Sequence, residues 1–113
     1  MTKIKFYKSN NKFIGLECKG HSGYAESGFD IVCSAISALV GSLHLGLRKV
    51  LKIKDLHFKQ DDNSGYFYIK ITNFENIHQS QILFETIFET LKEIQADYPK
   101  FVEIKQEELN EIY

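Results

Sequence analysis

The sequence predicts an α+β domain, an α/β two-layer sandwich in which two helices pack on one mixed or antiparallel sheet. Two observations indicate this class. Short segments that alternate polar and apolar residues come in two pairs, and each pair precedes a long segment whose apolar residues recur every three or four positions. A last short alternating segment follows, so the predicted order of elements is ββαββαβ.

The first pair of strands is predicted over residues 3–7 and 13–19, joined by a polar turn at residues 9–12. Strict alternation puts two sets of residues on opposite faces of the second strand: Phe13 and Gly15 on one, and Ile14, Leu16 and Cys18 on the other. The second pair is predicted over residues 56–59 and 66–71, on either side of a turn rich in Asp, Asn and Gly.

Helices are predicted over residues 31–52 and 73–96, and Pro99 ends the second. Apolar residues recur at helical spacing in the first: Ile31, Val32, Ala35, Ile36, Leu39, Val40, Leu43, Leu47, Val50 and Leu51. The expected core of the second is Ile77, Ile82, Leu83, Ile87, Leu91 and Ile94. A last strand is predicted at residues 101–105, and the acidic tail 106–113 is expected to fray or to pack on the surface.

Composition indicates one domain over residues 1–113, because a chain of this length buries about two-thirds of its unfolded surface in one core. Fourteen Lys and Arg against fifteen Asp and Glu argue against direct nucleic-acid binding, which depends on clustered positive charge. No apolar run has the length of a membrane span, and no secretory signal is recognisable. We therefore expect a cytoplasmic protein with no membrane attachment and with reduced thiols.

Reactive groups are concentrated where a glycine-rich loop, residues 20–29, meets the first predicted helix. Asp30 is expected to cap that helix, which makes Cys33 its third residue; orienting His21 is the alternative role of Asp30. Unpaired N–H groups of the first turn would then stabilise a thiolate or an oxyanion. His21 can act as the base for the thiol and then as the acid for the departing amine, and Ser37 lies one turn beyond Cys33.

These residues also have commoner roles. A cysteine in the first turn of an apolar helix is usually a small core residue, and a histidine after a glycine is usually loop material. Spacing alone leaves both interpretations open. Cys18 is expected to be a buried, inert strand thiol, and two cysteines fifteen residues apart do not form a metal site. Structural roles are expected for His44, His57 and His78.

The segments GHSGYA (residues 20–25) and GFDIVCSAIS (residues 28–37) closely resemble the ribosomal-processing cysteine protease family. The family pattern is Gly-His-small-Gly, a short loop, and then Gly-x-Asp-Ile-Val-Cys-small-Ala-aliphatic-Ser, and every position is filled here. The likeness extends to the chain length and to the order of elements. Its specificity rests mainly on residues 20–37.

The resemblance implies a cysteine endopeptidase that removes the N-terminal extension of a large-subunit ribosomal protein after an aromatic residue. It also implies a homodimer that needs neither metal nor organic cofactor. His21 and Cys33 match the family's catalytic dyad, and Gly20, Asp30 and Ser37 match supporting positions. The matching substrate-binding loop contributes Ser22, Gly23, Tyr24, Gly28 and Phe29. Tyr24 and Phe29 either close over the peptide or anchor the loop to the core.

Two other interpretations stay open at this point. One is a non-catalytic ribosome-assembly or protein-binding module that uses the same loop and groove without turnover. The other is a redox-sensing thiol, for which Cys18 is the available resolving cysteine. The position of Cys18 in a predicted strand argues against the redox interpretation.

Overall fold

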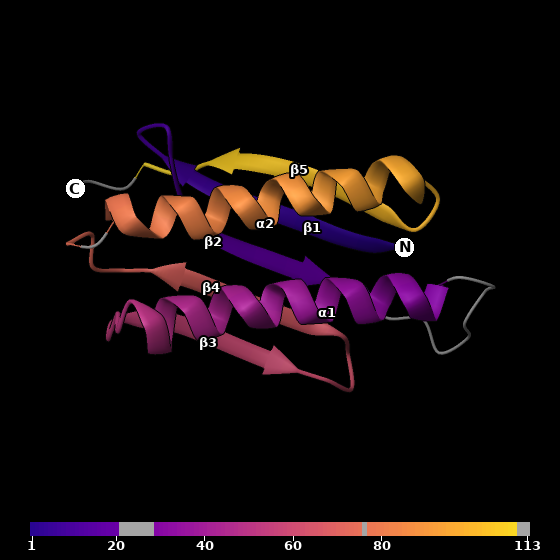
Figure 1. Ribbon diagram of the computed structural model, residues 1–113, viewed down its shortest axis with the longest axis horizontal. Coiled ribbons are helices and arrows are strands. Elements are labelled where there is room, and N and C mark those ends of the chain that lie inside the picture. Colours follow the sequence, from indigo (N-terminus) through magenta and orange to yellow (C-terminus); the bar gives the residue numbers. More distant parts are fainter. Residues whose placement is uncertain (21–28, 76, 111–113) are drawn as a thin grey trace.

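The computed structural model describes residues 1–20, 29–75 and 77–110. Five strands form one sheet in the order β3-β4-β2-β1-β5, and both helices lie on one face of it (Figure 1). The bounds are β1 Thr2–Ser9, β2 Lys12–Lys19, α1 Phe29–Leu45, η1 Gly46–Val50, β3 Leu56–Asp61, β4 Tyr66–Ile71, α2 Ile77–Asp97 and β5 Val102–Glu108. The predicted two-layer ββαββαβ architecture is confirmed.

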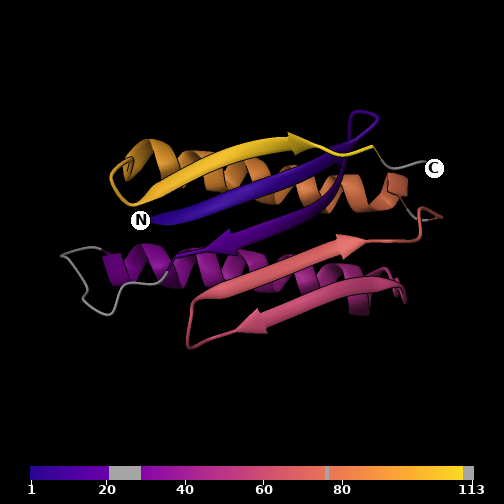
Figure 2. The ribbon, with the colours of Figure 1, turned by 180° about the vertical axis from the view of Figure 1, so that it is seen from behind.

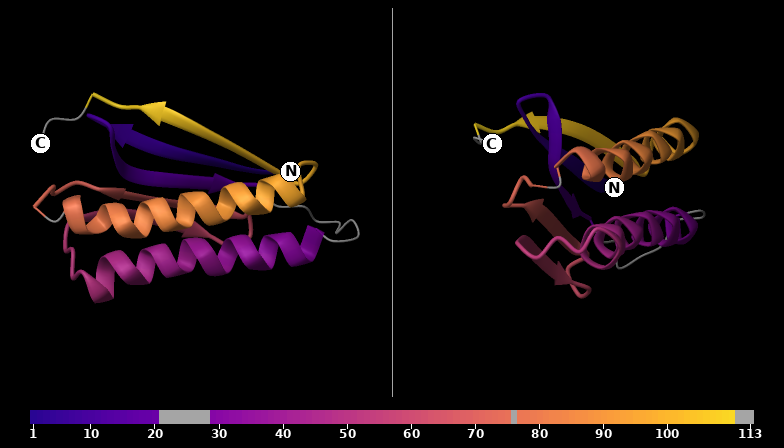
Figure 3. Two further views of the ribbon diagram at one scale, coloured as in Figure 1. Left: turned by 45° about the horizontal axis from the view of Figure 1, so that its top comes forward. Right: turned by 60° about the vertical axis from the view of Figure 1, so that its left-hand side comes forward.

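In the part of the chain that the structure describes, no helix covers the opposite face of the sheet (Figure 2). The end-on view shows the same two layers, with the strands on one side and α1 and α2 on the other (Figure 3). α1 lies over the β3–β4 side of the sheet and α2 over the β1–β5 side (Figure 1). The N-terminus lies at the end of the molecule where α1 begins (Figure 1).

The sheet is mixed, because β1 pairs antiparallel with β2 and parallel with β5. β5 continues to Glu108, which pairs with Lys8, so the prediction of a frayed or surface-packed tail from residue 106 is wrong for residues 106–108. Pairing with β1 extends the strand, and Glu107 forms an ion pair with Lys5 at 3.5 Å. The backbone N–H of Leu109 donates to the carbonyl oxygen of Lys8 at 2.7 Å.

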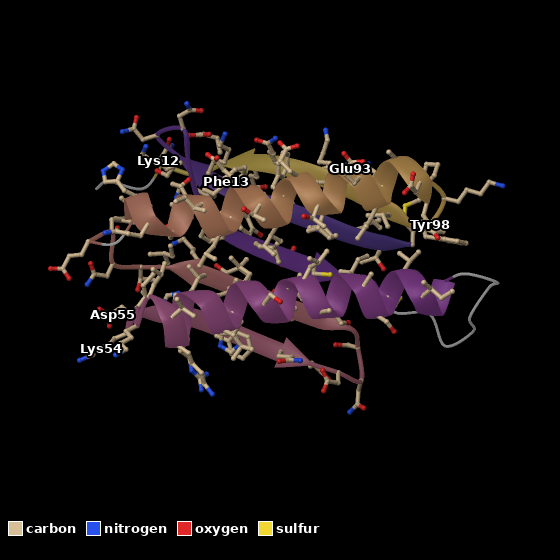
Figure 4. All side chains as sticks on the ribbon, in the orientation of Figure 1. Lys12, Phe13, Lys54, Asp55, Glu93 and Tyr98 are labelled. Atoms are coloured by element: carbon tan, nitrogen blue, oxygen red, sulfur yellow. The ribbon has the colours of Figure 1, made fainter. Side chains whose placement is uncertain are left out.

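A β-bulge changes the predicted faces of β2. The register between β1 and β2 shifts at this point: Tyr7 pairs with Gly15, and the next residue, Lys8, pairs with Phe13. Ile14 is the extra residue of the bulge, so Phe13 points to the opposite face from the one that strict alternation predicts. Phe13, which is labelled in Figure 4, therefore joins Leu16 and Cys18 in the core under the helices. Its ring stacks on Phe84 of α2. Ile14 packs with Tyr7 and Ile77 in a second cluster.

The predicted start and core of α2 need correction. The helix begins at Ile77, because the Asn73 side chain accepts a hydrogen bond from the Glu75 N–H at 3.0 Å and holds residues 73–75 in a turn. Ile82 is 72% exposed. The buried residues lie three and four positions apart on the other side of the helix: Ile77, Ser80, Phe84, Ile87 and Leu91.

The buried stripe of α1 and η1 is narrower than the sequence predicts. Ile31 is 68% exposed and Val50 is 74% exposed, because both lie outside the stripe that faces the sheet. That stripe consists of Val32, Ile36, Val40, Leu43 and Leu47. By length and composition alone, residues 31–50 could also cross a membrane. A core helix passes the same test, and this stripe packs in the main core cluster.

Candidate active site

An open hollow of about 660 Å³ lies between α1, the turn that joins β3 to β4, and the ends of β1 and β2. The side of the hollow formed by α1 consists mostly of small or polar residues: Cys33, Ser34, Ser37, Gly41 and His44. Thr2 lines it from β1, and Cys18 and Gly20 line it from the end of β2. Gln60 and Asp61 line it from the end of β3, and Asp62 lines it from the turn. A Cβ atom added at Gly41 would meet nothing within 4 Å, so this face of α1 is open.

Cys33 is a free, half-buried thiol on this wall. α1 begins at Phe29, so Cys33 is its fifth residue, and the predictions that Asp30 caps the helix and that Cys33 is the third residue are wrong. Asp30 lies inside the first turn of the helix. The N–H groups that lack a partner within the helix belong to the residues before Val32.

Cys18 lines the same hollow but is only 7% exposed. Burial, and after it the nearby Cys33, raise the pKa of the Cys18 thiol to about 12. Cys18 therefore keeps its proton near neutral pH, as expected for an inert core thiol. A resolving cysteine must react as a thiolate, so this position weakens the redox interpretation.

His44 closes the hollow at the end away from Cys33. Its ring stacks on Phe58 with centroids 3.9 Å apart, and its Nε2 accepts a hydrogen bond from Arg48 Nη1 at 3.3 Å. Burial and the Arg48 charge lower the pKa of His44 from 6.5. On the other side of His44, a second hollow of about 490 Å³ extends to Lys52 and Lys54. Lys54 is labelled at the left-hand end of Figure 4.

Neither His44 nor Tyr66 is suited to take a proton from Cys33. His44 follows Cys33 by eleven positions, which correspond to about 16 Å along a helix axis. The Tyr66 hydroxyl donates to Glu17 Oε2 at 2.9 Å. Burial and this hydrogen bond raise the pKa of Tyr66 to about 12. Neither of these two lining side chains is therefore a suitable general base for Cys33.

Gly20 is required by the backbone. Its φ angle of 127° is unfavourable for any residue with a side chain. A Cβ atom at this position would also lie 2.8 Å from Thr2 Cα. The chain can therefore leave β2 in this direction only at a glycine, and the next residue is His21.

The structure brings together three of the predicted site residues: Gly20, Cys33 and Ser37. His21, Ser22, Gly23, Tyr24 and Gly28 lie outside the described residues, as do the side chains of Phe29 and Asp30. The pairing of His21 with Cys33 stays a prediction. Within residues 1–20, 29–75 and 77–110, no group of three or more His, Cys, Asp or Glu residues could hold a metal ion.

Sequence reasoning did not predict that the end of β3, the β3–β4 turn and Thr2 line the same hollow as Cys33. The polar turn after β3 was recognised as a turn, but nothing in its composition places it beside α1. That placement depends on β4 pairing with β2. His44 was expected to be structural, and its stacking on Phe58 confirms a packing role. Its position at the end of the hollow was not foreseen.

Comparisons with known proteins agree with this architecture. A family model described as cysteine protease Prp matches residues 1–103. The ribosomal processing cysteine protease Prp of Staphylococcus aureus is 32% identical over 80 residues, which cover 70% of this chain and 73% of that protein. The Bacillus subtilis protein of the same name is 28% identical over 108 residues, covering 87% and 90%.

Solved structures show the same fold. SMU.848 from Streptococcus mutans superposes with a TM-score of 0.84 and 27% identity, over 96% of this chain and 99% of that one. The Prp protease from Staphylococcus aureus, solved in complex with a substrate peptide, gives a TM-score of 0.82 and 21% identity over 95% and 100%. With a family model covering nearly the whole chain, this chain belongs to the cysteine protease Prp family and is a cysteine-type endopeptidase, a hydrolase.

Proposed function

We propose that this chain removes the N-terminal extension of a large-subunit ribosomal protein by cutting after an aromatic residue. One observation carries the proposal: the half-buried Cys33 thiol lines a hollow of about 660 Å³ together with Gly20, the residue directly before His21. The curated relatives are named ribosomal processing proteases, which supports a ribosomal protein as the substrate.

In the proposed mechanism, the Cys33 thiolate adds to the carbonyl carbon of the scissile peptide bond. Helix-start N–H groups that lack intrahelical partners stabilise the resulting oxyanion. The C–N bond then breaks, and the His21 imidazolium gives its proton to the departing amine. Water activated by the neutral imidazole hydrolyses the thioester and restores the thiol. His21 is favoured as the base because His44 and Tyr66, which line the same hollow, are unsuited to that role.

The lining of the hollow is polar and apolar in different parts, and its apolar part supports binding of an aromatic side chain. Ile36, Val40 and Phe67 contribute apolar surface, while Ser34 and Gly41 keep α1 open. An aromatic side chain buries a large apolar area, so such a pocket favours it over a polar one. We propose that the residue before the cleaved bond occupies this apolar part.

We also propose a homodimer that works in the cytoplasm. Large apolar side chains are exposed on both helices, among them Leu45 at 52% and Ile82 at 72%, which supports a covered surface. Both cysteines are free, which fits a reducing compartment. Sedimentation of the wild type and of Ile82→Glu tests the dimer: we expect the variant alone to sediment as a monomer, and a monomeric wild type would contradict it.

The function is tested by incubating the protein with the extended ribosomal protein and measuring the mass of each product. We expect loss of the N-terminal segment after an aromatic residue, and no product with Cys33→Ala. A binding module without turnover would leave the ribosomal protein intact with either protein. A cut after a residue of another class would overturn the specificity but not the peptidase activity.

A further inference from the structure

The Thr2 hydroxyl is an exception to the hydrogen bonding of this fold. Thr2 is 3% exposed, and its Oγ1 is buried without a hydrogen-bond partner. In the described part of the chain, the other buried side-chain nitrogen and oxygen atoms have partners. A buried hydroxyl without a partner costs stability, and such groups in native structures call for an explanation.

The position of Thr2 connects this hydroxyl to the active site. Along β1, Thr2 alternates with Lys3 and lies on the same face as Ile4, which is buried under the helices. Gly20 lies against Thr2 and has no side chain to fill the space beside it. Thr2, Gly20 and Cys33 line the same hollow. The unpartnered hydroxyl therefore belongs to a residue at the edge of the space that holds the nucleophile.

We propose that Thr2 is a substrate-binding residue whose hydroxyl forms a hydrogen bond with a backbone peptide group of the bound chain, next to the scissile bond. A hydroxyl both donates and accepts, so it suits either the N–H or the C=O of a peptide group. Rotation about χ1 moves Oγ1 between three staggered positions without backbone movement, so a residue that lines the hollow can turn its hydroxyl toward a bound chain. This inference rests on the proposed function of the site.

The energetic consequence is specific. In the free protein the hydroxyl destabilises the fold, and in the complex it gains a partner. Removing it should therefore improve stability while weakening substrate binding. Loss of a residue with a purely structural role changes stability but has no selective effect on substrate binding. The melting temperature and the KM, measured together, therefore distinguish a substrate-binding role from a structural one.

The test compares Thr2→Val, which keeps the shape and loses the hydroxyl, with Thr2→Ser, which keeps the hydroxyl. The probe is a synthetic peptide spanning the N-terminal extension and the first residues of the mature ribosomal protein. For Thr2→Val we expect a melting temperature at least equal to that of the wild type. We expect its KM, and its Kd measured in the Cys33→Ala background, to rise about three- to tenfold. Thr2→Ser should keep the KM near the wild-type value.

Thr72→Val is the matched control. The Thr72 hydroxyl donates to the carbonyl oxygen of Asp55 at 2.6 Å and lies away from the hollow. This variant should lose stability and keep the wild-type KM, the opposite pattern to Thr2→Val.

Two results would overturn the inference: an unchanged KM in Thr2→Val, or a raised KM that comes with a lower melting temperature and is not restored by serine. Both results leave the proposed function standing, because the wild type cuts the peptide in each. A wild-type protein that neither binds nor cuts this peptide would overturn the proposed function and this inference together.

Discussion

α1 and α2 cover the same face of one sheet, and among the described residues the hollow of about 660 Å³ is lined by α1 and not by α2. Under α2 the gap is filled by aromatic rings: Phe88 meets Phe6 edge-on with centroids 5.0 Å apart, and Phe84 stacks on Phe13 at 6.2 Å. The wall that α1 presents to the hollow carries serines and a glycine instead. Side-chain size, and not the architecture, therefore decides which half of this fold holds the hollow and which half is filled by core side chains.

The sharpest test of this division is Cys33→Ala, on the α1 side. We expect peptide cleavage to fall at least about 10³-fold, because the nucleophile is lost, while the melting temperature changes little. Cleavage is measured by mass spectrometry of the products. Cys18→Ala is the control, since it removes a thiol from the same hollow but leaves the half-buried one in place. Full activity in Cys33→Ala would show that the chemistry lies elsewhere.

Phe84→Ala tests the α2 side. Phe84 is fully buried, and its loss should lower the free energy of unfolding by about 3–5 kcal/mol, because a cavity remains among the surrounding rings. The KM of the molecules that stay folded should be unchanged. Glu89→Ala, at an exposed position of the same helix, is the control and should change the free energy of unfolding by less than about 0.5 kcal/mol. Denaturant unfolding measures both, and equal costs would contradict the assigned core of α2.

Two glycines refine the comparison. Gly41 faces open space, so Gly41→Ala should raise the free energy of unfolding by about 0.5–1 kcal/mol through helix propensity. At Gly46 an added Cβ atom would lie 2.8 Å from Leu83 Cδ1 of α2. Gly46→Ala should therefore gain less than Gly41→Ala, or lose stability, because Leu83 has to move. Urea unfolding of the two variants decides the order, and a larger gain at Gly46 would show that the helices are less tightly packed than described.

His44 predicts a smaller, pH-dependent effect. Burial and Arg48 lower its pKa below 6.5, so the unfolded state binds a proton more readily than the folded state. His44 therefore contributes to the free energy of unfolding in full above pH 6.5. That contribution decreases as the pH falls from 6.5 through the lower pKa of the folded state. We expect His44→Gln to lose stability less steeply than the wild type between pH 7.5 and pH 5.5, measured by urea unfolding. Parallel slopes would contradict a lowered pKa, and His57→Gln, on an exposed strand position, serves as the control.

Local pattern was enough for much of the fold. The alternating residues 66–71 coincide with β4, and Pro99 follows the last residues of α2. The errors lie where tertiary contacts override local preference. The bulge at Ile14 breaks a strict alternation, and pairing with β1 extends β5 to Glu108. At α2, Ile82 has a core-like side chain on the wrong side of the helix.

The candidate site was predictable from a sequence motif and not from the periodicity of apolar residues. Cys33, Gly20 and Ser37 were found from a motif, and the structure brings these three into one hollow. Asp30 was misplaced as a cap because the helix starts before it, at Phe29. Thr2 has no signal in the sequence, since one threonine in a strand looks like any other, and its unpartnered hydroxyl exists only after burial.

The sequence by itself determined the order of elements, the motif that marks the family, and the glycine required where the chain leaves β2. The tertiary structure alone decided which surfaces meet: the β3–β4 turn beside α1, Thr2 beside Gly20, and the rings of Phe13 under α2. The physical reason is the separation along the chain of the residues that make each contact. Residue type and spacing control contacts within a helix turn or a strand, whereas strand order and a bulge set distances between residues far apart in the chain.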